Sequence, residues 1–134
     1  MTDDPLYRSE AAWADTLRQF ADDPDVEGYA RGYRKGMALS TAGDRLSEST
    51  QREIEALRSH GESATLDGYE DGLLWHDLTR HAGIVRLMVR RSGLSSRRWA
   101  EQAMVRDERT VRRWLAGRAI PAAVVRELRR RLME

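Results

Sequence analysis

The chain has 134 residues, a length that suits one domain or two small helical units. Hydrophobic residues make up 40% and charged residues 34%, so we expect a packed core and exclude disorder throughout. The chain has no cysteines, which excludes disulfides and thiolate metal sites. Together with an acidic N-terminus that lacks an apolar run, this composition predicts a cytoplasmic protein without a secretory signal. No apolar stretch approaches the roughly 20 residues that cross a bilayer.

Charge is divided unevenly along the chain, although the net charge is only +1. Residues 1–78 hold 8 basic and 17 acidic residues, a net charge of −9, whereas residues 79–134 hold 15 arginines and 5 acids, a net charge of +10. Opposed halves of this kind indicate an acidic module joined to a module that binds a polyanion. We therefore expect an acidic helical domain over 1–78, for dimerisation or binding of a protein partner, and a basic domain over 79–134.

The residue pattern predicts an all-α fold, because no segment alternates apolar and polar residues as a half-buried strand would. Capping residues and apolar spacing place the helices of the first half. The expected elements are a helix after the cap Ser9 with Trp13, Leu17 and Phe20 on one face, a helix from about Pro24 to Leu39, a loop over 41–49, a helix with a capping box of Thr50 and Glu53 that ends at His60 and Gly61, and a helix from about Thr65.

A weak internal repeat lies in this half, where Glu27 to Gly32 recurs forty residues later as Asp67 to Gly72. Glycine costs about 1 kcal/mol relative to alanine inside a helix, so glycines at spacing four need a physical reason. Close approach of two helices supplies one. The glycine surface is therefore predicted to pack helices within the chain, with a dimer interface or a ligand site as alternatives. Its residues are Gly28, Tyr29, Gly32, Tyr33 and Gly36.

Acidic residues of the fourth expected helix share one face, namely Asp67, Glu70 and Asp71. Paired carboxylates can carry out acid–base chemistry or hold a divalent cation. An exposed acidic patch is the commoner outcome and is the one expected here. His76 and His81 are five residues apart, which does not align them on one helical face for a metal. Because no phosphate-binding glycine loop or nucleophile elbow occurs either, we predict no enzyme activity, no metal and no cofactor.

The second half carries sharper helix signals, because capping residues and terminating glycines alternate along it. The predicted elements are a helix through Ile84 and Leu87 that Gly93 closes, a short helix capped by Ser95 that runs to about Met104, a helix over Glu108 to Ala116 that is capped by Asp107 and ended by Gly117, and a last helix over Ala122 to Leu132 with an inward stripe of Val124, Val125, Leu128 and Leu132.

Short segments of this half occur in a characteristic order. They are Gly93-Leu94-Ser95, Trp99-Ala100, Arg109 to Trp114, and Gly117 followed by Ile120-Pro121. With these segments the chain resembles the lambda repressor and Cro-like helix-turn-helix domains of phage and bacterial regulators, over about residues 84–132. The resemblance implies a small C-terminal helical bundle that binds double-stranded DNA as a homodimer and represses a promoter by occupying its operator.

The helix that begins at Glu108 is predicted to enter the major groove, because it divides into two unlike faces. Val111, Trp114 and Leu115 share one side and suit a core. Arginine can bond guanine at two atoms, which is worth roughly 1–3 kcal/mol of discrimination per good pair. The residues expected to contact bases are Glu108, Arg109, Arg112 and Arg113.

Phosphate contacts are predicted around the same helix, where hydroxyls, backbone amides and arginines can fix the register of the protein on DNA. The residues expected to make them are Ser95, Ser96, Arg97, Thr110 and Arg118. Other arginines are expected on an ordinary solvated face of the last helix. These are Arg126, Arg129, Arg130 and Arg131.

The sequence thus predicts a sequence-specific transcriptional regulator that binds an operator as a dimer. Two alternatives stay open at this point. The acidic half of the chain could imitate nucleic acid in a phage-type inhibitor that binds a protein. The basic half could instead bind DNA without sequence preference, as an accessory protein does.

Overall fold

The computed structural model describes residues 23–41, 48–104 and 106–132, and over these the chain is all helical, as predicted. The helices are α2 (Pro24–Thr41), α3 (Glu48–Ser59), α4 (Ser63–Leu73), the 3-10 helix η2 (Leu78–Arg80), α5 (Ala82–Ser92), α6 (Ser96–Gln102), α7 (Glu108–Leu115) and α8 (Ala122–Leu132). The helix expected after Ser9 lies outside the described residues. No helix within these ranges combines the length and the apolar character needed to cross a membrane.

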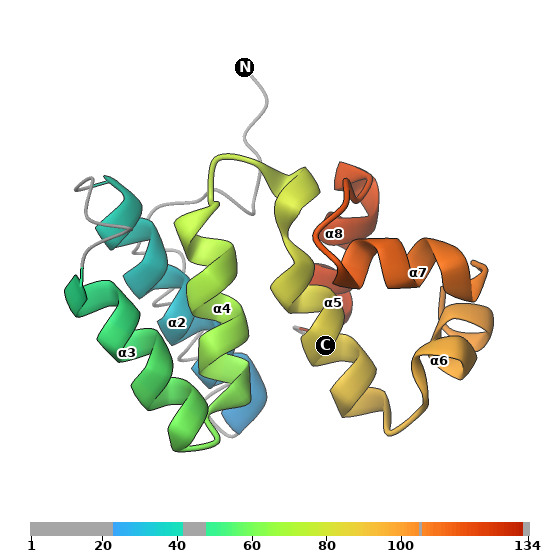
Figure 1. Cartoon of the computed structure of the whole chain (residues 1–134). Coiled ribbons are helices and arrows are strands. Elements are labelled where there is room, and N and C mark those ends of the chain that lie inside the picture. The colour runs from blue at the N-terminus through green and yellow to red at the C-terminus, as the bar shows by residue number, and fades with distance from the viewer. Residues whose placement is uncertain (1–22, 42–47, 105, 133–134) are drawn as a thin grey trace.

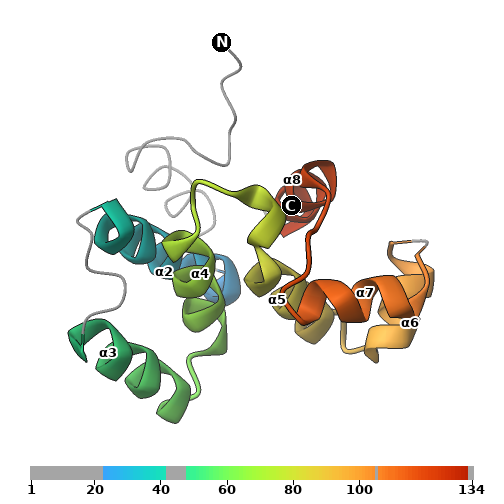
Figure 2. The same cartoon turned by 45° about the horizontal axis from the view of Figure 1, so that its top comes forward.

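The helices form two groups that lie side by side (Figures 1 and 2). One group holds α2, α3 and α4, and the other holds α5, α6, α7 and α8. The chain passes from one to the other through η2, so that α4 and α5 are neighbours at the junction. This arrangement leaves α6 and α7 on the side of the molecule that is remote from α2 and α3.

Helices α2 and α4 run parallel and touch along their backbones, because glycines face the partner helix on both sides. A methyl group added at any of these glycines would overlap a backbone oxygen of the partner: that of Thr65 at Gly32, of Tyr69 at Gly36, of Tyr29 at Gly68 and of Tyr33 at Gly72. The first copy of the sequence repeat therefore lies in α2 and the second in α4, and the two copies form the contacting faces of this helix pair. The structure places the glycine surface inside the chain, with Tyr29 and Tyr33 fully buried beside it.

The start of α3 differs from the prediction. The helix begins at Glu48, two residues before Thr50, and Thr50 is buried within its first turn. The predicted capping box is therefore wrong, because Thr50 occupies a helical position instead of the cap. Glu53, its expected partner, forms an ion pair with Lys35 of α2. The end of α3 is as predicted, with Gly61 in the left-handed region at φ 71°.

Local signals in the second half do form the predicted caps. Gly93 closes α5 with φ 69°, and Gly117 follows α7 with φ 87°. The Ser95 hydroxyl accepts a hydrogen bond from the Arg98 amide at 3.2 Å, which caps α6. The Asp107 carboxylate accepts one from the Thr110 amide at 2.8 Å, which caps α7. The predicted inward stripe of α8 is buried as well.

Asp71 of α4 is a buried carboxylate at the junction of the two groups and is only 1% exposed. It accepts hydrogen bonds from the Tyr29 hydroxyl at 2.6 Å and from the amides of Gly83 and Ile84, both at 2.8 Å. It therefore caps the start of α5 from another helix. Burial raises the pKa of Asp71 to about 7, against the effect of these hydrogen bonds, which lower it.

The expected exposed acidic patch on α4 is therefore wrong for two of its three carboxylates. Asp67 is 4% exposed and also lies inside the fold. Helix α4 packs between α2 and α5, so the face that carries Asp67 and Asp71 meets α5 instead of solvent. Burial is also the main cause that raises the pKa of Asp67.

Arg129 of α8 is buried, whereas the sequence predicted a solvated side chain. Its guanidinium lies over the rings of Tyr29 and Tyr33, at 5.3 and 4.7 Å from their centres. Cations over aromatic faces are stabilised by the ring quadrupole, most strongly where water is excluded. The sequence pattern missed this contact because the tyrosines belong to α2, about a hundred residues earlier.

His81 is a buried neutral histidine in the same region. Its Nδ1 lies 2.9 Å from the Asp77 carbonyl oxygen, and its Nε2 lies 3.0 Å from the Tyr33 hydroxyl. Since a carbonyl only accepts, Nδ1 carries the proton and Nε2 accepts from Tyr33. Burial, reinforced by the charge of Arg129, lowers the pKa of His81 to about 3. The residue is thus a structural link between α2 and the start of α5.

The hydrophobic core continues across the predicted domain boundary at residue 78. Val26 and Tyr29 of the first group belong to the same buried cluster as Ile84, Trp99 and Leu128 of the second. Together with the bonds of Asp71, this shared core makes α2 and α4 part of the support for α5 and α8.

Candidate nucleic-acid interface

Helix α7 presents one face to the core and the other to solvent. Val111 and Trp114 are buried, while Arg109, Arg112 and Arg113 are exposed. This division follows from the spacing of the apolar residues. The predicted base-contacting arginines therefore stand on the outside of the molecule.

Glu108 and Arg112 are paired with each other along α7. The Arg112 Nε atom lies 3.4 Å from a Glu108 carboxylate oxygen, one helical turn away. Both side chains reach solvent, so the ion pair is weak and can open. Of the predicted base contacts, Arg109 and Arg113 have no carboxylate in ion-pair range within the described parts of the chain.

The predicted phosphate-binding residues flank this helix on two sides. Ser95 and Arg97 are exposed at the start of α6, and Ser96 is half-buried beside them. Arg97 lies 3.3 Å from Glu101 in an exposed pair. Arg118 is exposed on the loop that follows α7.

Both segments that border α7 are held by backbone hydrogen bonds. Before it, the Arg106 amide donates to the Ala100 carbonyl oxygen at 2.9 Å. After it, the Arg118 amide donates to the Arg113 carbonyl oxygen at 2.9 Å, and the Ile120 amide donates to the Thr79 carbonyl oxygen at 2.8 Å. The backbone of Arg106 is thus bonded to α6, and that of Arg118 to the end of α7.

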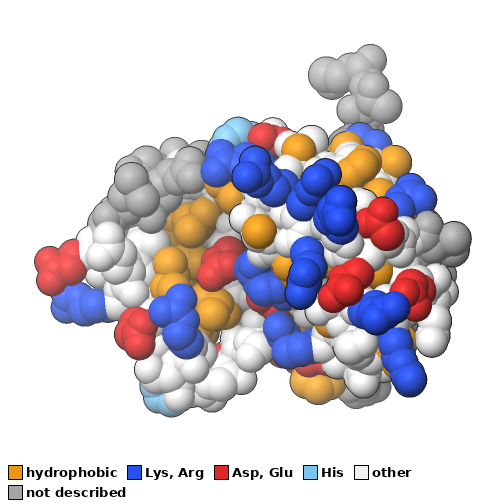
Figure 3. Space-filling view, turned by 45° about the vertical axis from the view of Figure 1, so that its right-hand side comes forward, with side chains coloured by type: hydrophobic (Ala, Val, Ile, Leu, Met, Phe, Trp, Pro, Cys, Tyr) orange, Lys and Arg blue, Asp and Glu red, His pale blue; other side chains and the backbone are white. Residues whose placement is uncertain are grey.

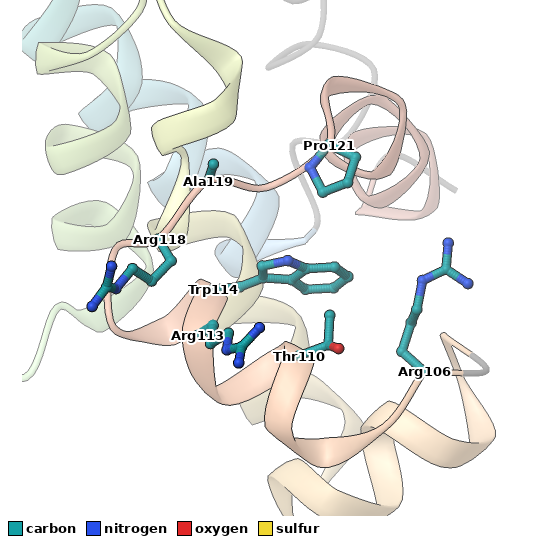
Figure 4. Close-up of a pocket in the computed structure, with 7 residues that line it drawn as sticks. All are labelled: Arg106, Thr110, Arg113, Trp114, Arg118, Ala119 and Pro121. Carbon is teal, nitrogen blue, oxygen red and sulfur yellow. The ribbon is translucent and has the colours of Figure 1, made fainter.

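A hollow of about 580 Å³ lies beside α7, on the flank that faces the start of α8 (Figure 4). None of the described residues that line it is acidic. They are Arg106, Thr110, Arg113, Trp114, Arg118, Ala119 and Pro121. Thr110, Arg113 and Arg118 are predicted DNA contacts, whereas Arg106 is not among the residues predicted from the sequence. The missed signal is a basic residue in the turn directly before the cap Asp107.

Arginines of α5 are used differently from those around α7, because they bind the acidic residues of the first half. Arg86 pairs with Asp67 at 3.2 Å and with Glu70, and Arg90 pairs with Asp67 at 2.6 Å. Arg91 pairs with Asp23 at 2.9 Å. The negative charge of the first group is thus partly neutralised inside the molecule.

The exposed arginines that have no such partner gather around α7. Figure 3 shows the Lys and Arg side chains on the side of the molecule where α5, α6 and α7 lie. Within the described ranges, the exposed arginines that form no ion pair with a carboxylate within 4.0 Å are Arg80, Arg98, Arg106, Arg109, Arg113 and Arg118. All of them belong to residues 80–118. This surface is therefore suited to a polyanion.

In the part of the chain that the structure describes, no group of three or more His, Cys, Asp or Glu residues is placed to hold a metal ion. His60 bonds the Ala56 carbonyl oxygen of its own helix at 2.6 Å, near the helix end where it was expected. His76 is exposed and lies edge-on to Trp75.

No family model, curated protein or solved structure matches the chain.

Proposed function

We propose that the chain is a sequence-specific DNA-binding transcriptional regulator whose helix α7 enters the major groove of an operator. The observation that carries this proposal is that exposed arginines without an ion-paired carboxylate lie on α7 and on the segments at its two ends. A single helix fits the major groove, and arginines on its outer face can reach guanine edges. In this function α6 and α7 form the two helices of the helix-turn-helix.

The proposed roles follow from where each side chain stands. Arg109, Arg112 and Arg113 read bases from the exposed face of α7, and Glu108 either accepts from cytosine or keeps Arg112 in place. Phosphates are bound by the exposed start of α6 and by the α7 borders. The residues proposed for phosphate contacts are Ser95, Ser96, Arg97, Thr110 and Arg118.

A homodimer is part of the proposal, since two copies would read half-sites about one helical turn apart. Such a dimer needs a surface other than the glycines of α2. Those glycines already contact α4 of the same chain, and a second helix has no access to them.

The alternative of a nucleic-acid mimic is less well supported. A mimic presents its carboxylates to a partner protein, whereas Asp67 is buried and paired with Arg86 and Arg90. We therefore favour DNA over a protein as the main partner. An accessory protein that binds DNA without sequence preference would use the same arginines, and the experiment below separates it from a specific regulator.

The test is selection of bound duplexes from a random-sequence pool, followed by sequencing. We expect a recovered motif, and binding to it that weakens steeply with salt because arginines displace counterions from phosphates. An exposed arginine far from α7 provides the matched control: Arg58→Ala in α3 should leave affinity and motif unchanged. Salt-dependent binding with no recovered motif would indicate the non-specific protein, and no binding at low salt would reject DNA as the partner.

A further inference from the structure

We propose that the hollow beside α7 holds the sugar-phosphate backbone of one DNA strand, with Arg106 and Arg118 binding phosphates from its two ends. The inference rests on the proposed function and deepens it. It adds Arg106 to the interface and fixes which flank of α7 a strand follows.

The position of the two arginines carries the inference. Figure 4 shows Arg106 on the turn before α7 and Arg118 on the loop after it, with Thr110 and Trp114 between them. Helix α7 has 8 residues. At about 1.5 Å per residue it spans roughly 12 Å, a length that takes in more than one phosphate of a strand. The arginines can therefore bind separate phosphates of the same strand.

The lining matches the chemistry of a nucleic-acid backbone. The guanidinium groups of Arg106 and Arg118 and the Thr110 hydroxyl are donors for phosphate oxygens. Ala119 and Pro121 are exposed and offer an apolar surface to the sugars between phosphates, while Trp114 lies buried beneath them. No carboxylate among the described lining residues opposes an anion.

The site is also ordered before it binds. The Arg106 amide is bonded to the Ala100 carbonyl oxygen, and the Arg118 amide to that of Arg113. Because both backbones are already hydrogen-bonded within the fold, binding a strand orders mainly the side chains, which limits the entropic cost. Contacts to phosphates of this kind set the register of α7 without reading sequence.

The test measures binding of the full chain to a 20-bp duplex of the selected sequence, and to a random duplex, over a series of salt concentrations. Arg106→Ala and Arg118→Ala should each reduce the slope of log affinity against log salt by about 0.9, the effect of one lost phosphate contact. Each substitution should lower the affinity for the selected duplex and for the random duplex by the same factor. Arg58→Ala serves as the control, and circular dichroism checks that each variant is folded.

The outcomes separate this inference from the proposed function. If the wild-type chain binds no duplex at low salt, both fail. If it binds the selected duplex while Arg106→Ala keeps the wild-type slope, the inference is overturned and the proposed function stands. ATP and inorganic phosphate are titrated as separate probes. Arg106-dependent binding of either probe that leaves DNA binding unchanged would assign the hollow to a free phosphate compound and overturn the inference.

Discussion

At the scale of single residues, the unusual feature is a set of ionisable groups buried where the two helix groups meet. Asp71, His81 and Arg129 all have exposed fractions of a few per cent or less. Tyr29 and Tyr33 join them, since Tyr29 donates to Asp71 and Tyr33 donates to His81. Burial of polar groups is costly unless they are hydrogen-bonded, and these bonds link α2 to α4 and α5. The junction is therefore held by polar contacts that depend on protonation.

Asp71→Asn should change how stability depends on pH. The pKa of Asp71 is raised from 3.8 to about 7 in the folded chain. The contribution of this carboxyl group to the free energy of unfolding is therefore fully present below pH 3.8 and is lost as pH rises through 7. Between these two pH values the free energy of unfolding falls by about 1.4 kcal/mol per pH unit. The stability of the wild type relative to Asp71→Asn should thus be greatest near pH 4 and should shrink towards pH 7.

Urea unfolding of both proteins at several pH values measures this difference. His81 is present in both, so its own titration, which acts in the opposite direction, largely cancels. Ala56→Ser on the exposed face of α3 changes no titratable group, so this control should give a difference that is constant with pH. A wild-type advantage that grows with pH would show that the three hydrogen-bond donors keep Asp71 ionised.

At the scale of elements, the closest contact is that between α2 and α4. Their glycines remove the side chains that would hold the helices apart, and backbone meets backbone. Every glycine in a helix interior lowers helix propensity, so the stability of the pair comes from this packing. The cost of adding one methyl group therefore depends on what the new atom meets.

Gly32→Ala should destabilise the chain by about 3 kcal/mol, because its methyl group meets the backbone of Thr65, which cannot move without moving α4. Gly28→Ala is the matched control on the same face. There the nearest atom, at 3.0 Å, is the Thr65 side-chain oxygen, which can rotate, and alanine favours the helix. Thermal unfolding should show a large loss at Gly32 and little change at Gly28. Equal effects would contradict this packing.

Helix α7 supplies the prediction on recognition. Arg109→Ala should relax base preference at one position of the selected motif, because its side chain stands on the exposed face away from the hollow. Arg97→Ala should lower the affinity for every DNA sequence by the same factor, because a phosphate contact carries no sequence information. Binding of both variants to a panel of single-base changes distinguishes these results. Equal losses of affinity on every duplex for both variants would contradict the assignment of Arg109 to a base contact and of Arg97 to a phosphate contact.

Which features of the fold and of the candidate site could be predicted from the sequence depends on how far apart along the chain the interacting residues are. Caps such as Ser95 and Asp107 were predicted because they bond amides three residues away. The burial of Asp71 and Arg129 was not predicted, because both side chains contact Tyr29. Along the chain, Asp71 is 42 residues and Arg129 is 100 residues from this tyrosine. The exposed face of α7 followed from periodicity. Arg106 was missed because its place in the hollow is set by tertiary packing, not by a helical face.

At the scale of the whole molecule, the two charge blocks of the sequence fold against each other. Carboxylates of the first group bind arginines of α5, and both groups share one core. Among the described residues, the exposed arginines without an ion-paired carboxylate belong to residues 80–118 and include those of α7 and its two borders. The uneven charge of the chain therefore serves two purposes in the proposed function: joining the halves and presenting a basic surface to DNA.

A fragment of residues 79–134 should consequently fail to fold cooperatively. Without Asp71 the start of α5 loses its cap, and without Tyr29 and Tyr33 the buried cation of Arg129 loses its surroundings. Circular dichroism during heating should show low helix content and no sharp transition. Adding a fragment of residues 1–78 should restore both, because it returns the missing carboxylate and the aromatic rings. A sharp transition in the 79–134 fragment alone would mean that the basic half is an independent domain that needs none of these contacts.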